Sequence, residues 1–453
     1  MGIVISTFFK QRNIFYGWVI VFVCFVSIFS VFGVRLSFGV FFDALTRDTQ
    51  FNWSRAQTAS VFSTVMIIFA LTSTPAGWAL DRFGPRRVFT VGALLVGTGL
   101  IMVSRMNSLA EFILYYGIWT GLGITILGLS IQAATISRWF DRLGRRGLAI
   151  GLAFSGTGVG ILLMAPLVER LIAFYDWRMA FLALAAIMLF FNLPVLLLLM
   201  RNHPREVGLY PDGAEHLLTP KHSAPSLSQT KTISDSSRNP TSTAEEKSWT
   251  FAQAFRTRLF WIIMLAGACS LFTLRMITVH QVAHLVDQGF SRFTAATVTG
   301  STGLITAGAF IIFGQLSDRI GRGRAFYIGA VAQLIALFIL INLNAEMLNI
   351  TLYVYALFWG IGEGSRSGLL TAIASDTFPG SAQGTIIGAL GAFFGVGSAI
   401  GSWLGGFVFD QVGQYDVAFW TAFTCTIVAT LSIYYVERLT IPTAPSSLHR
   451  PLE

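Results

Sequence analysis

Twelve long apolar stretches, separated by short polar turns, constrain the fold of this 453-residue chain more than any other feature. A helix of about 20 apolar residues crosses a lipid bilayer, and the stretches have about that length or more. Charged residues make up only 12% of the chain, whereas an ordinary soluble domain has about 25%. So few charges cannot cover a globule of this size, so the sequence predicts an all-α membrane protein. We place the spans at 16–42, 56–79, 88–105, 109–137, 146–171, 178–200, 259–286, 293–316, 324–343, 348–375, 383–409 and 416–436.

The region between the sixth and seventh spans, 201–258, divides the chain into six spans plus six. Its middle, 217–247, is rich in Ser, Thr, Pro and Lys and has no periodicity, which predicts a disordered linker. Its end, Trp249–Arg258, mixes apolar and polar residues and predicts a short interfacial helix. We therefore expect an N-terminal bundle over 1–200, a cytoplasmic linker over 201–258, and a C-terminal bundle with its tail over 259–453.

The two halves are related in sequence. The charged turn Gly77–Arg87 recurs as Gly314–Arg324, so that Asp81 and Asp318 lie 237 positions apart. Span five carries Gly147, Gly151, Gly158 and Gly160, and span eleven repeats them at the same offset as Gly384, Gly388, Gly395 and Gly397. A constant offset over separate landmarks predicts two parallel six-helix repeats, related by an axis along the membrane normal.

The basic residues set the expected orientation. If both termini are cytoplasmic, 22 of the 31 Lys and Arg residues lie on the cytoplasmic side and 6 on the opposite side. This bias follows the positive-inside rule. The net charge of +9 is therefore a topology signal and does not indicate nucleic-acid binding. The N-terminus lacks the short apolar region and cleavage site of a signal peptide, so we expect the first span to be retained.

The two charged turns resemble the signature of the major facilitator superfamily of secondary transporters, in its loops 2–3 and 8–9. Within the superfamily, the chain resembles the monocarboxylate carriers and their bacterial relatives, which include oxalate–formate exchangers. Three regions carry this second resemblance: Tyr16–Trp18 with Ser37–Phe42, Trp139–Gly151 with Ser155-Gly156, and His284–Ser291. Similar motifs occur in relatives that carry siderophores or aromatic acids. The resemblance implies two pseudo-symmetric bundles that work by alternating access, and a multi-pass protein of a bacterial inner membrane.

The chain also departs from these families. Span eight carries no charge, where the animal carriers have an Asp–Arg pair. Span eleven carries no Lys, where the oxalate exchanger has one. For this reason the substrate of neither family is assigned to this chain.

Four charged residues stand out within the spans: Arg35, Arg275, Glu363 and Arg366. A charge at mid-bilayer costs roughly 2.5–3.5 kcal/mol on insertion scales, so it usually faces a cavity or a partner. Arg35 and Arg275 are 240 positions apart and so hold nearly equivalent places in spans one and seven. The resemblance implies that these helices line a central cavity. The four charges sum to +2, which favours an anion. We predict that Arg35, Arg275 or both bind a substrate carboxylate; the alternative is that they snorkel or cap helix ends.

Glu363 and Arg366 are three residues apart, which places them on one helix face. They form either a mutually neutralising pair or a pair for which substrate or proton competes. Tyr355 and Trp359 precede Glu363 by one to two turns and are candidate substrate contacts. His280 is either a structural histidine or a proton-sensing contact. His280 has no Cys or carboxylate close by in the sequence, so we expect no metal site.

The charged turns and the glycines are predicted to serve the conformational change. The resemblance implies a cytoplasmic gate at the two turns, formed by Asp81, Arg82, Asp318 and Arg319. It also implies that spans five and eleven meet the opposite half. Small residues allow such helices to approach closely, and the candidate packing residues are Gly151, Gly156, Gly160, Gly388, Gly395 and Gly397.

Together these features predict a secondary transporter that moves a small organic anion, of the monocarboxylate class, together with a proton. We expect a monomer in membrane lipid, with no cofactor, no enzyme activity and no phosphate-binding loop for ATP. The first alternative is a proton-coupled exporter of drugs or metabolites, in which Glu363 carries the proton and both arginines are structural. A second is uptake of a larger carboxylate, such as an aromatic acid or siderophore. Two other classes of membrane protein fit the sequence less well. A sensor would need an output domain, and a channel would need a ring of charges around its pore.

Overall fold

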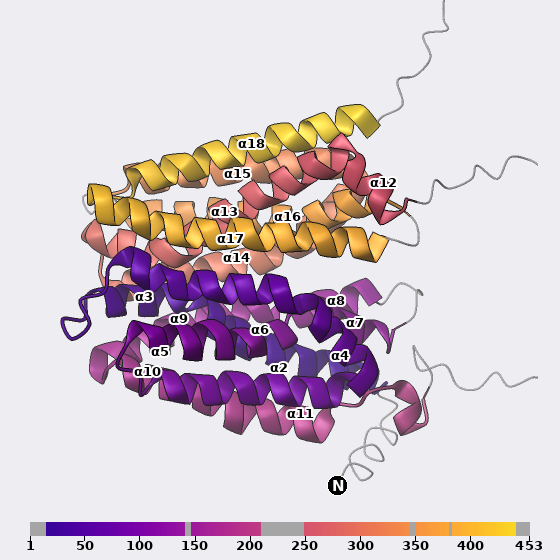
Figure 1. Cartoon of the computed structure of the whole chain (residues 1–453), viewed down its shortest axis with the longest axis horizontal. Coiled ribbons are helices and arrows are strands. Elements are labelled where there is room, and N and C mark those ends of the chain that lie inside the picture. Colours follow the sequence, from indigo (N-terminus) through magenta and orange to yellow (C-terminus); the bar gives the residue numbers. More distant parts are fainter. Residues whose placement is uncertain (1–14, 141–145, 210–248, 345–348, 380–382, 441–453) are drawn as a thin grey trace, which may run out of the picture.

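The computed structural model describes residues 15–140, 146–209, 249–344, 349–379 and 383–440, and within these ranges the chain is helical apart from turns. Figure 1 shows two layers of long helices. Helices α2 to α11 form the lower layer, and α12 to α18 form the upper one. The predicted linker segment 217–247 lies outside the described residues.

The lower layer carries the first six predicted spans. Its helices are α2 (Gly17–Leu36), α3 (Phe38–Thr46), α4 (Arg55–Val103), α5 (Leu109–Phe112), η1 (Ile113–Thr120), α6 (Gly121–Ile126), α7 (Leu129–Ser137), α8 (Arg146–Phe154), α9 (Gly156–Phe174), α10 (Trp177–Ala186), η2 (Ile187–Asn192), α11 (Leu193–Leu199) and η3 (Pro204–Val207). Several of these segments join end to end, so that α2 with α3, and α8 with α9, each form one long span.

The upper layer carries the other six spans, and most of these are single uninterrupted helices. They are α12 (Phe251–Arg256), α13 (Arg258–Asp287), α14 (Arg292–Ile320), α15 (Arg322–Asn342), α16 (Asn349–Thr377), α17 (Gln383–Val412) and α18 (Asp416–Thr440). The short helix α12 begins with a capping box between Thr250 and Gln253, inside the segment for which the sequence predicts a short helix.

Helix α4 contains two predicted spans. Its 49 residues are too long for one crossing of about 30 Å. The helix breaks at Gly84, whose φ of 76° and ψ of 160° suit a glycine. Its two arms pack against the same neighbour, because Gly121 approaches Val65 of the first arm and Gly123 approaches Gly92 of the second. With α4 crossing twice and α16 included, the described helices supply the twelve predicted passes.

The first helix of each half is the most enclosed. The most apolar window is 83% buried in Gly17–Thr46 and 61% buried in α13, but only 28% in Trp177–Leu199 and 33% in Asp416–Leu439. Enclosed helices next to the partner layer are where polar side chains can avoid lipid. The fold therefore places Arg35 on α2 and Arg275 on α13 near the middle of the molecule.

The two layers meet along α4 with α17 and along α9 with α14. On the first contact, Ser63 of α4 donates to the Ala399 carbonyl at 2.9 Å and lies 2.7 Å from the Ser402 hydroxyl. On the second, a Cβ on Gly158 would lie 2.5 Å from the Gly303 carbonyl oxygen. Small residues therefore bring the helices of opposite layers into backbone contact at these places.

The glycine prediction needs a correction. Gly156 and Gly160 pack on Phe25 and Phe29 of α2, in their own layer, and Gly397 packs on Ala268 of α13, also in its own layer. A Cβ on Gly151 or Gly388 would meet nothing within 4 Å. Among the predicted residues, Gly395 does face the opposite layer, where it approaches Ala70 of α4, and so does Gly158, which was not among them. Residues two apart on a helix point about 200° apart, so Gly158 faces away from Gly156 and Gly160.

Candidate functional site

The guanidinium of Arg35 is buried on α2 with few polar partners. It is 6% exposed, its Nη2 donates to the Met66 sulfur at 3.3 Å, and its Nε has no hydrogen-bond partner. The rings of Phe32 and Phe69 lie 5.5 and 5.7 Å from its carbon Cζ. A thioether is a weak acceptor, and the two rings supply only a weak attraction for a cation. Arg35 therefore keeps most of its capacity to bind an anion.

Arg275 on α13 lies close enough to Arg35 for the two cations to repel each other. Its Nε and Nη1 have no hydrogen-bond partner. A buried charged donor without a partner is destabilising by about 1–3 kcal/mol or more, so such groups usually mark a function. The Tyr116 hydroxyl, on η1, is also without a partner and interacts electrostatically with Arg35. Sequence analysis missed Tyr116, because nothing in its span of apolar residues distinguishes it from a packing aromatic.

Glu363 on α16 supplies the negative charge in this region. It interacts electrostatically with Arg275, and Thr306 of α14 donates to its Oε2 at 3.4 Å. It also interacts with Trp359, one turn earlier on the same helix. The centre of the molecule thus holds two cations from the first helices of the two halves and one carboxyl from α16.

A cavity of about 30 Å³ lies beside this charge cluster, and side chains of both layers line it. The lower layer contributes residues of α2 and α9, and the upper layer contributes residues of α13, α14 and α16. The lining residues are Leu36, Thr157, Ile161, Thr278, Gln281, Thr302, Gly303, Thr306, Trp359 and Glu363. The chamber between the halves therefore has both polar and apolar walls, with room for one or two waters.

Trp359 and Tyr355 differ in their position relative to the cavity. Trp359 lines the cavity, as a substrate contact would. Tyr355 is buried and donates to Gln281 Oε1 at 2.8 Å, and its ring stacks at 6.4 Å from that of Trp359. Tyr355 therefore supports the wall of the cavity through Gln281, which the sequence analysis did not single out.

Arg366 faces away from this chamber. It is 3% exposed, its Nη2 donates to the Ser270 hydroxyl at 2.8 Å, and its Cζ lies 4.8 Å from the Phe326 ring centroid. Its Nε and Nη1 have no hydrogen-bond partner. The spacing of three residues places Glu363 and Arg366 on one helix face, but their side chains reach towards different neighbouring helices.

His280 lies in the protein interior with both ring nitrogens satisfied. Its Nε2 lies 2.8 Å from the Ser402 carbonyl, so that nitrogen carries a proton. Its Nδ1 lies 3.2 Å from the Tyr415 hydroxyl, which accepts from Arg55 at 2.7 Å. Burial raises the pKa of Tyr415, which therefore stays a neutral hydroxyl that can donate to His280. This arrangement suits the structural role for His280, rather than a proton-sensing contact.

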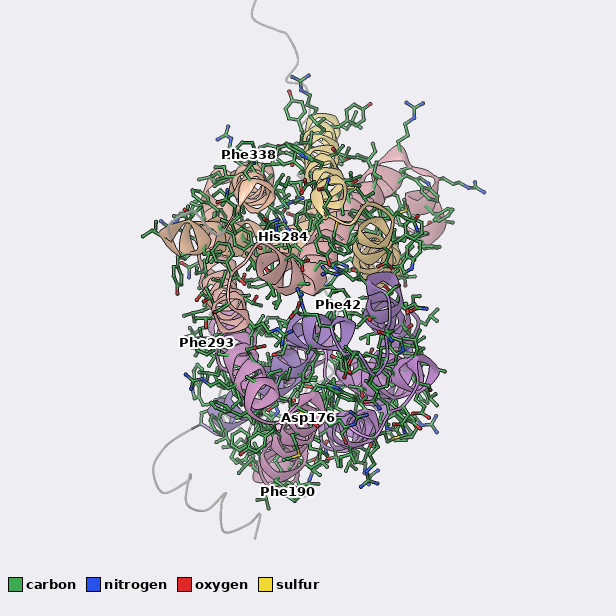
Figure 2. The ribbon with its side chains drawn as sticks, turned by 90° about the vertical axis from the view of Figure 1, so that its left-hand side faces the viewer. Phe42, Asp176, Phe190, His284, Phe293 and Phe338 are labelled. Carbon is green, nitrogen blue, oxygen red and sulfur yellow. The ribbon has the colours of Figure 1, made fainter. Side chains whose placement is uncertain are left out.

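At one end of the molecule, which we call the closed end, ion pairs join the two layers. Asp287 at the end of α13 accepts from Arg55 at 2.6 Å and from Arg47 at 2.6 Å. Asp43, at the end of α3, accepts from Arg47 at 2.7 Å and from Arg292 of α14 at 3.2 Å. Figure 2 views this end along the helices and shows Phe42, next to Asp43, facing the region of His284 across the boundary of the layers.

The closed end has the symmetry of the sequence repeat. Arg55 begins α4 and Arg292 begins α14, and these residues lie 237 positions apart, as Asp81 and Asp318 do. Each arginine pairs with the aspartate that ends the first span of the opposite half. Asp410 of α17 accepts from the backbone amides of Arg55 and Ala56 at 2.9 and 2.8 Å. On α9, about one turn from the place that corresponds to Asp410, buried Glu169 interacts electrostatically with Arg292 and Asp43.

The other end, which we call the Asp81 end, holds the two charged turns. Asp81 is 79% exposed and accepts from Arg138 of its own layer at 2.8 Å. Arg82 stacks over Trp78 and Phe83 at 5.3 and 5.7 Å, and Arg319 is exposed. The side chain of Asp318 lies outside the described residues. The ion pairs described at this end, Asp81–Arg138 and Arg322–Asp376, each stay within one layer.

Comparison with known proteins identifies the family to which this chain belongs. The family model described as Major Facilitator Superfamily matches residues 20–345 and 287–452. The chain belongs to the major facilitator superfamily of transporters, and its relatives include monocarboxylate transporters.

Individual relatives support that grouping. Monocarboxylate transporter 12 of Mus musculus is 26% identical over 419 residues, which cover 89% of this chain and 82% of the relative. Monocarboxylate transporter 13 of Bos taurus is 35% identical over 175 residues, which cover 38% of this chain and 40% of the relative. Among solved structures, the crystal structure of a bacterial homologue of the human lysosomal transporter Spinster matches with a TM-score of 0.66. That structure is inward-facing and unoccupied, is 15% identical, and the match covers 93% of this chain and 97% of that one.

Proposed function

We propose that the protein transports a small organic anion, of the monocarboxylate class, by alternating access between its two halves. One observation carries the proposal: Arg35 interacts electrostatically with Arg275 of the other half, and both have buried donors without a hydrogen-bond partner. Cations that interact electrostatically repel each other, and an anion within reach of both would satisfy both. A carboxylate matches the donor geometry of a guanidinium, so it is the anion this site favours.

The size and lining of the site favour a small substrate. The cavity between the halves has a volume of about 30 Å³ in this conformation, and Trp359, Ile161 and Leu36 give it apolar walls. Such walls suit the carbon chain or ring of a monocarboxylate, while the arginines hold its charged end. The names of the relatives, monocarboxylate transporters 12 and 13, support the same substrate class for this chain.

We infer that the conformation is inward-facing. The positive-inside rule orients the charged turns, and therefore the Asp81 end, towards the cytoplasm of a bacterial inner membrane. The closed end, with its ion pairs between the halves, then faces outwards. In the opposite state the Asp81 end would close, and we propose that Asp81, Arg82, Asp318 and Arg319 form contacts between the halves there.

A proton is the coupling ion in this proposal, with Glu363 as the group that binds it. An anion that enters alone works against a negative-inside membrane potential, whereas an anion with a proton is neutral. Glu363 lines the cavity and interacts with Arg275, so proton binding there and anion binding at Arg275 influence each other.

The test uses purified protein in proteoliposomes and a panel of labelled lactate, pyruvate, acetate, benzoate and oxalate. We expect saturable uptake of at least one monocarboxylate, accelerated by an inward proton gradient. Arg275→Gln is expected to reduce affinity by about 10- to 100-fold, the effect of one or two lost charge-assisted hydrogen bonds. Arg105→Gln is the matched control, because Arg105 is exposed.

Two results would overturn the proposal. The first is unchanged monocarboxylate affinity in both Arg35→Gln and Arg275→Gln. The second is transport of lipophilic cations without any anion transport, which would assign the protein to the exporters of the same fold. Oxalate as the preferred substrate would keep the anion site and change the substrate class from a monocarboxylate to a dicarboxylate.

A further inference from the structure

Glu363 borders two separate cavities. One is the chamber between the halves, where it meets Thr306 and Trp359. The other is a small chamber of about 10 Å³ within the upper layer, lined by Ser270, Leu271, Leu274, Gln333, Gly362, Glu363, Arg366 and Leu370. The carboxyl group thus lies in the wall between a site shared by both halves and a site enclosed in one half.

The second chamber contains an incompletely satisfied cation. Arg366 is 3% exposed, and of its guanidinium nitrogens only Nη2 has a described hydrogen bond, to Ser270. Its Nε and Nη1 are buried without a partner, and so is Oε1 of Gln333. Such a site is unfavourable as it stands, because a buried guanidinium needs an anion or several acceptors. The carboxyl group in the wall of this chamber belongs to Glu363.

The backbone around Glu363 is held in place by its neighbours. A Cβ on Gly360 would lie 2.7 Å from Ile305 of α14, and one on Gly362 would lie 2.7 Å from Gln333 of α15. Gly364 is pressed against Thr306 of α14 in the same way. Helix α16 therefore has little freedom to shift, so any change of partner for Glu363 must come from rotation of its side chain. Residues three apart on a helix are neighbours, so rotation alone can bring its carboxylate to Arg366.

We propose that Glu363 exchanges between two arginines, with Arg275 as its neighbour in this structure and Arg366 as its partner when a carboxylate ligand occupies Arg275. The inference rests on the proposed function, because it requires an anion at Arg275. Two carboxylates beside one guanidinium repel each other, so the ligand must displace Glu363 or leave it protonated. Arg366 supplies a destination for the displaced carboxylate, which makes it a positioning residue for substrate binding that touches no substrate itself.

The exchange predicts opposite effects for its two partners. In Glu363→Gln, the competitor for Arg275 is neutral, so the ligand binds about 10-fold more tightly. In Arg366→Gln, Glu363 loses its second partner and stays beside Arg275, so the ligand binds about 10-fold more weakly. In the double variant the displaced charge no longer exists, so the affinity returns to that of Glu363→Gln.

The experiment is calorimetric titration of the purified full-length protein with lactate, pyruvate and benzoate, each as a separate probe. Arg438→Gln is the control, since Arg438 lies on the surface of α18 and stacks on Tyr434. Rescue of Arg366→Gln by Glu363→Gln supports the exchange, because a merely structural role for Arg366 would leave the double variant as weak as the single one. Equal weakening in the single and double variants overturns it.

Two further measurements distinguish failure of the exchange from failure of a variant to fold. Glu363→Gln alone must bind more tightly, and failure to do so overturns the exchange even if Arg366→Gln does not fold. Arg366→Lys keeps a cation in the chamber and is expected to bind within about threefold of the unmodified protein. If Arg35→Gln and Arg275→Gln both bind the probes normally, the proposed function fails. If Arg275→Gln alone binds them normally, or if it loses binding while Glu363→Gln is unchanged, only the exchange fails.

Discussion

The central arginines are arranged for binding rather than for stability. Arg35 has a thioether and two aromatic rings as neighbours, and Arg275 has two donors without a partner. Each buried, unsatisfied charged donor is destabilising by about 1–3 kcal/mol or more. A chain selected for stability alone would place methionine or leucine here. The cost is offset when an anion satisfies both groups.

We predict that Arg35→Met stabilises the protein while it abolishes anion binding. The thermal midpoint in detergent should rise, because an unsatisfied buried cation is replaced by an apolar side chain of similar length. Arg55→Met is the matched comparison. It removes the 2.6 Å ion pair to Asp287 and should lower the midpoint. A lower midpoint for Arg35→Met would show that Arg35 serves the fold.

At the scale of the helix, the repeat explains which glycines matter. Gly158 and Gly395 are equivalent in the two halves, and each approaches a helix of the opposite half, at Gly303 and Ala70. Their neighbours Gly160 and Gly397 are also equivalent, and each packs on the first helix of its own half. One helix thus uses one face for the permanent contacts of its bundle and another for the contact that changes during transport.

Accordingly, Gly158→Ala should affect the conformational change more than binding. The added methyl group would meet the Gly303 carbonyl at 2.5 Å, and overpacking of this kind is destabilising by about 1–3 kcal/mol. Because the strain exists only where α9 and α14 are in close contact, we expect a changed uptake rate with nearly unchanged ligand affinity. Gly151→Ala is the control, since its methyl group would meet nothing within 4 Å. Equal rates for the two variants in proteoliposomes would contradict this role for Gly158.

The sequence predicted the elements well and their contacts less well. Apolar length was sufficient to place the twelve spans, because a bilayer imposes a nearly fixed helix length. The four charges of the centre also stood out, because charges are rare in spans. Spacing could not show that Glu363 and Arg366 reach towards different helices, nor that Gly156 faces α2, because these outcomes depend on neighbours distant in sequence. The repeat offset between Arg55 and Arg292 was a usable signal for the closed end, but the partners of these arginines were not visible without the fold.

At the scale of the whole molecule, two reciprocal ion pairs join the halves at the closed end. Each half contributes an aspartate at the end of its first span and an arginine at the start of its second, and each arginine binds the aspartate of the other half. Single exposed ion pairs are worth only about 0.2–1 kcal/mol, but here several share the same carboxylates and Asp43 is buried. A cluster of this strength can hold one conformation and still release it during transport.

Asp287→Asn should therefore shift the protein away from this conformation, since it weakens contacts to both Arg47 and Arg55. Spin labels at Arg105 and Asn344, on different halves near the closed end, should show a larger population of long distances by pulsed electron paramagnetic resonance. Spin labels at Arg205 and Arg324, near the Asp81 end, should show a larger population of short distances. Asp176→Asn is the control, because Asp176 caps α10 within one half. Unchanged distances at both ends would mean that the ion pairs do not determine the conformation.

The most direct measurement of the central claim compares a carboxylate with its uncharged amide. Calorimetric titration of the purified protein with benzoate and benzamide, and with lactate and lactamide, separates the charge from the shape of the ligand. The account predicts that at least one of these carboxylates binds, that its amide binds at least about 10-fold more weakly, and that Arg275→Gln removes most of this difference. Equal affinity for a carboxylate and its amide, or a preference that persists in both Arg35→Gln and Arg275→Gln, would contradict an anion site between the two halves.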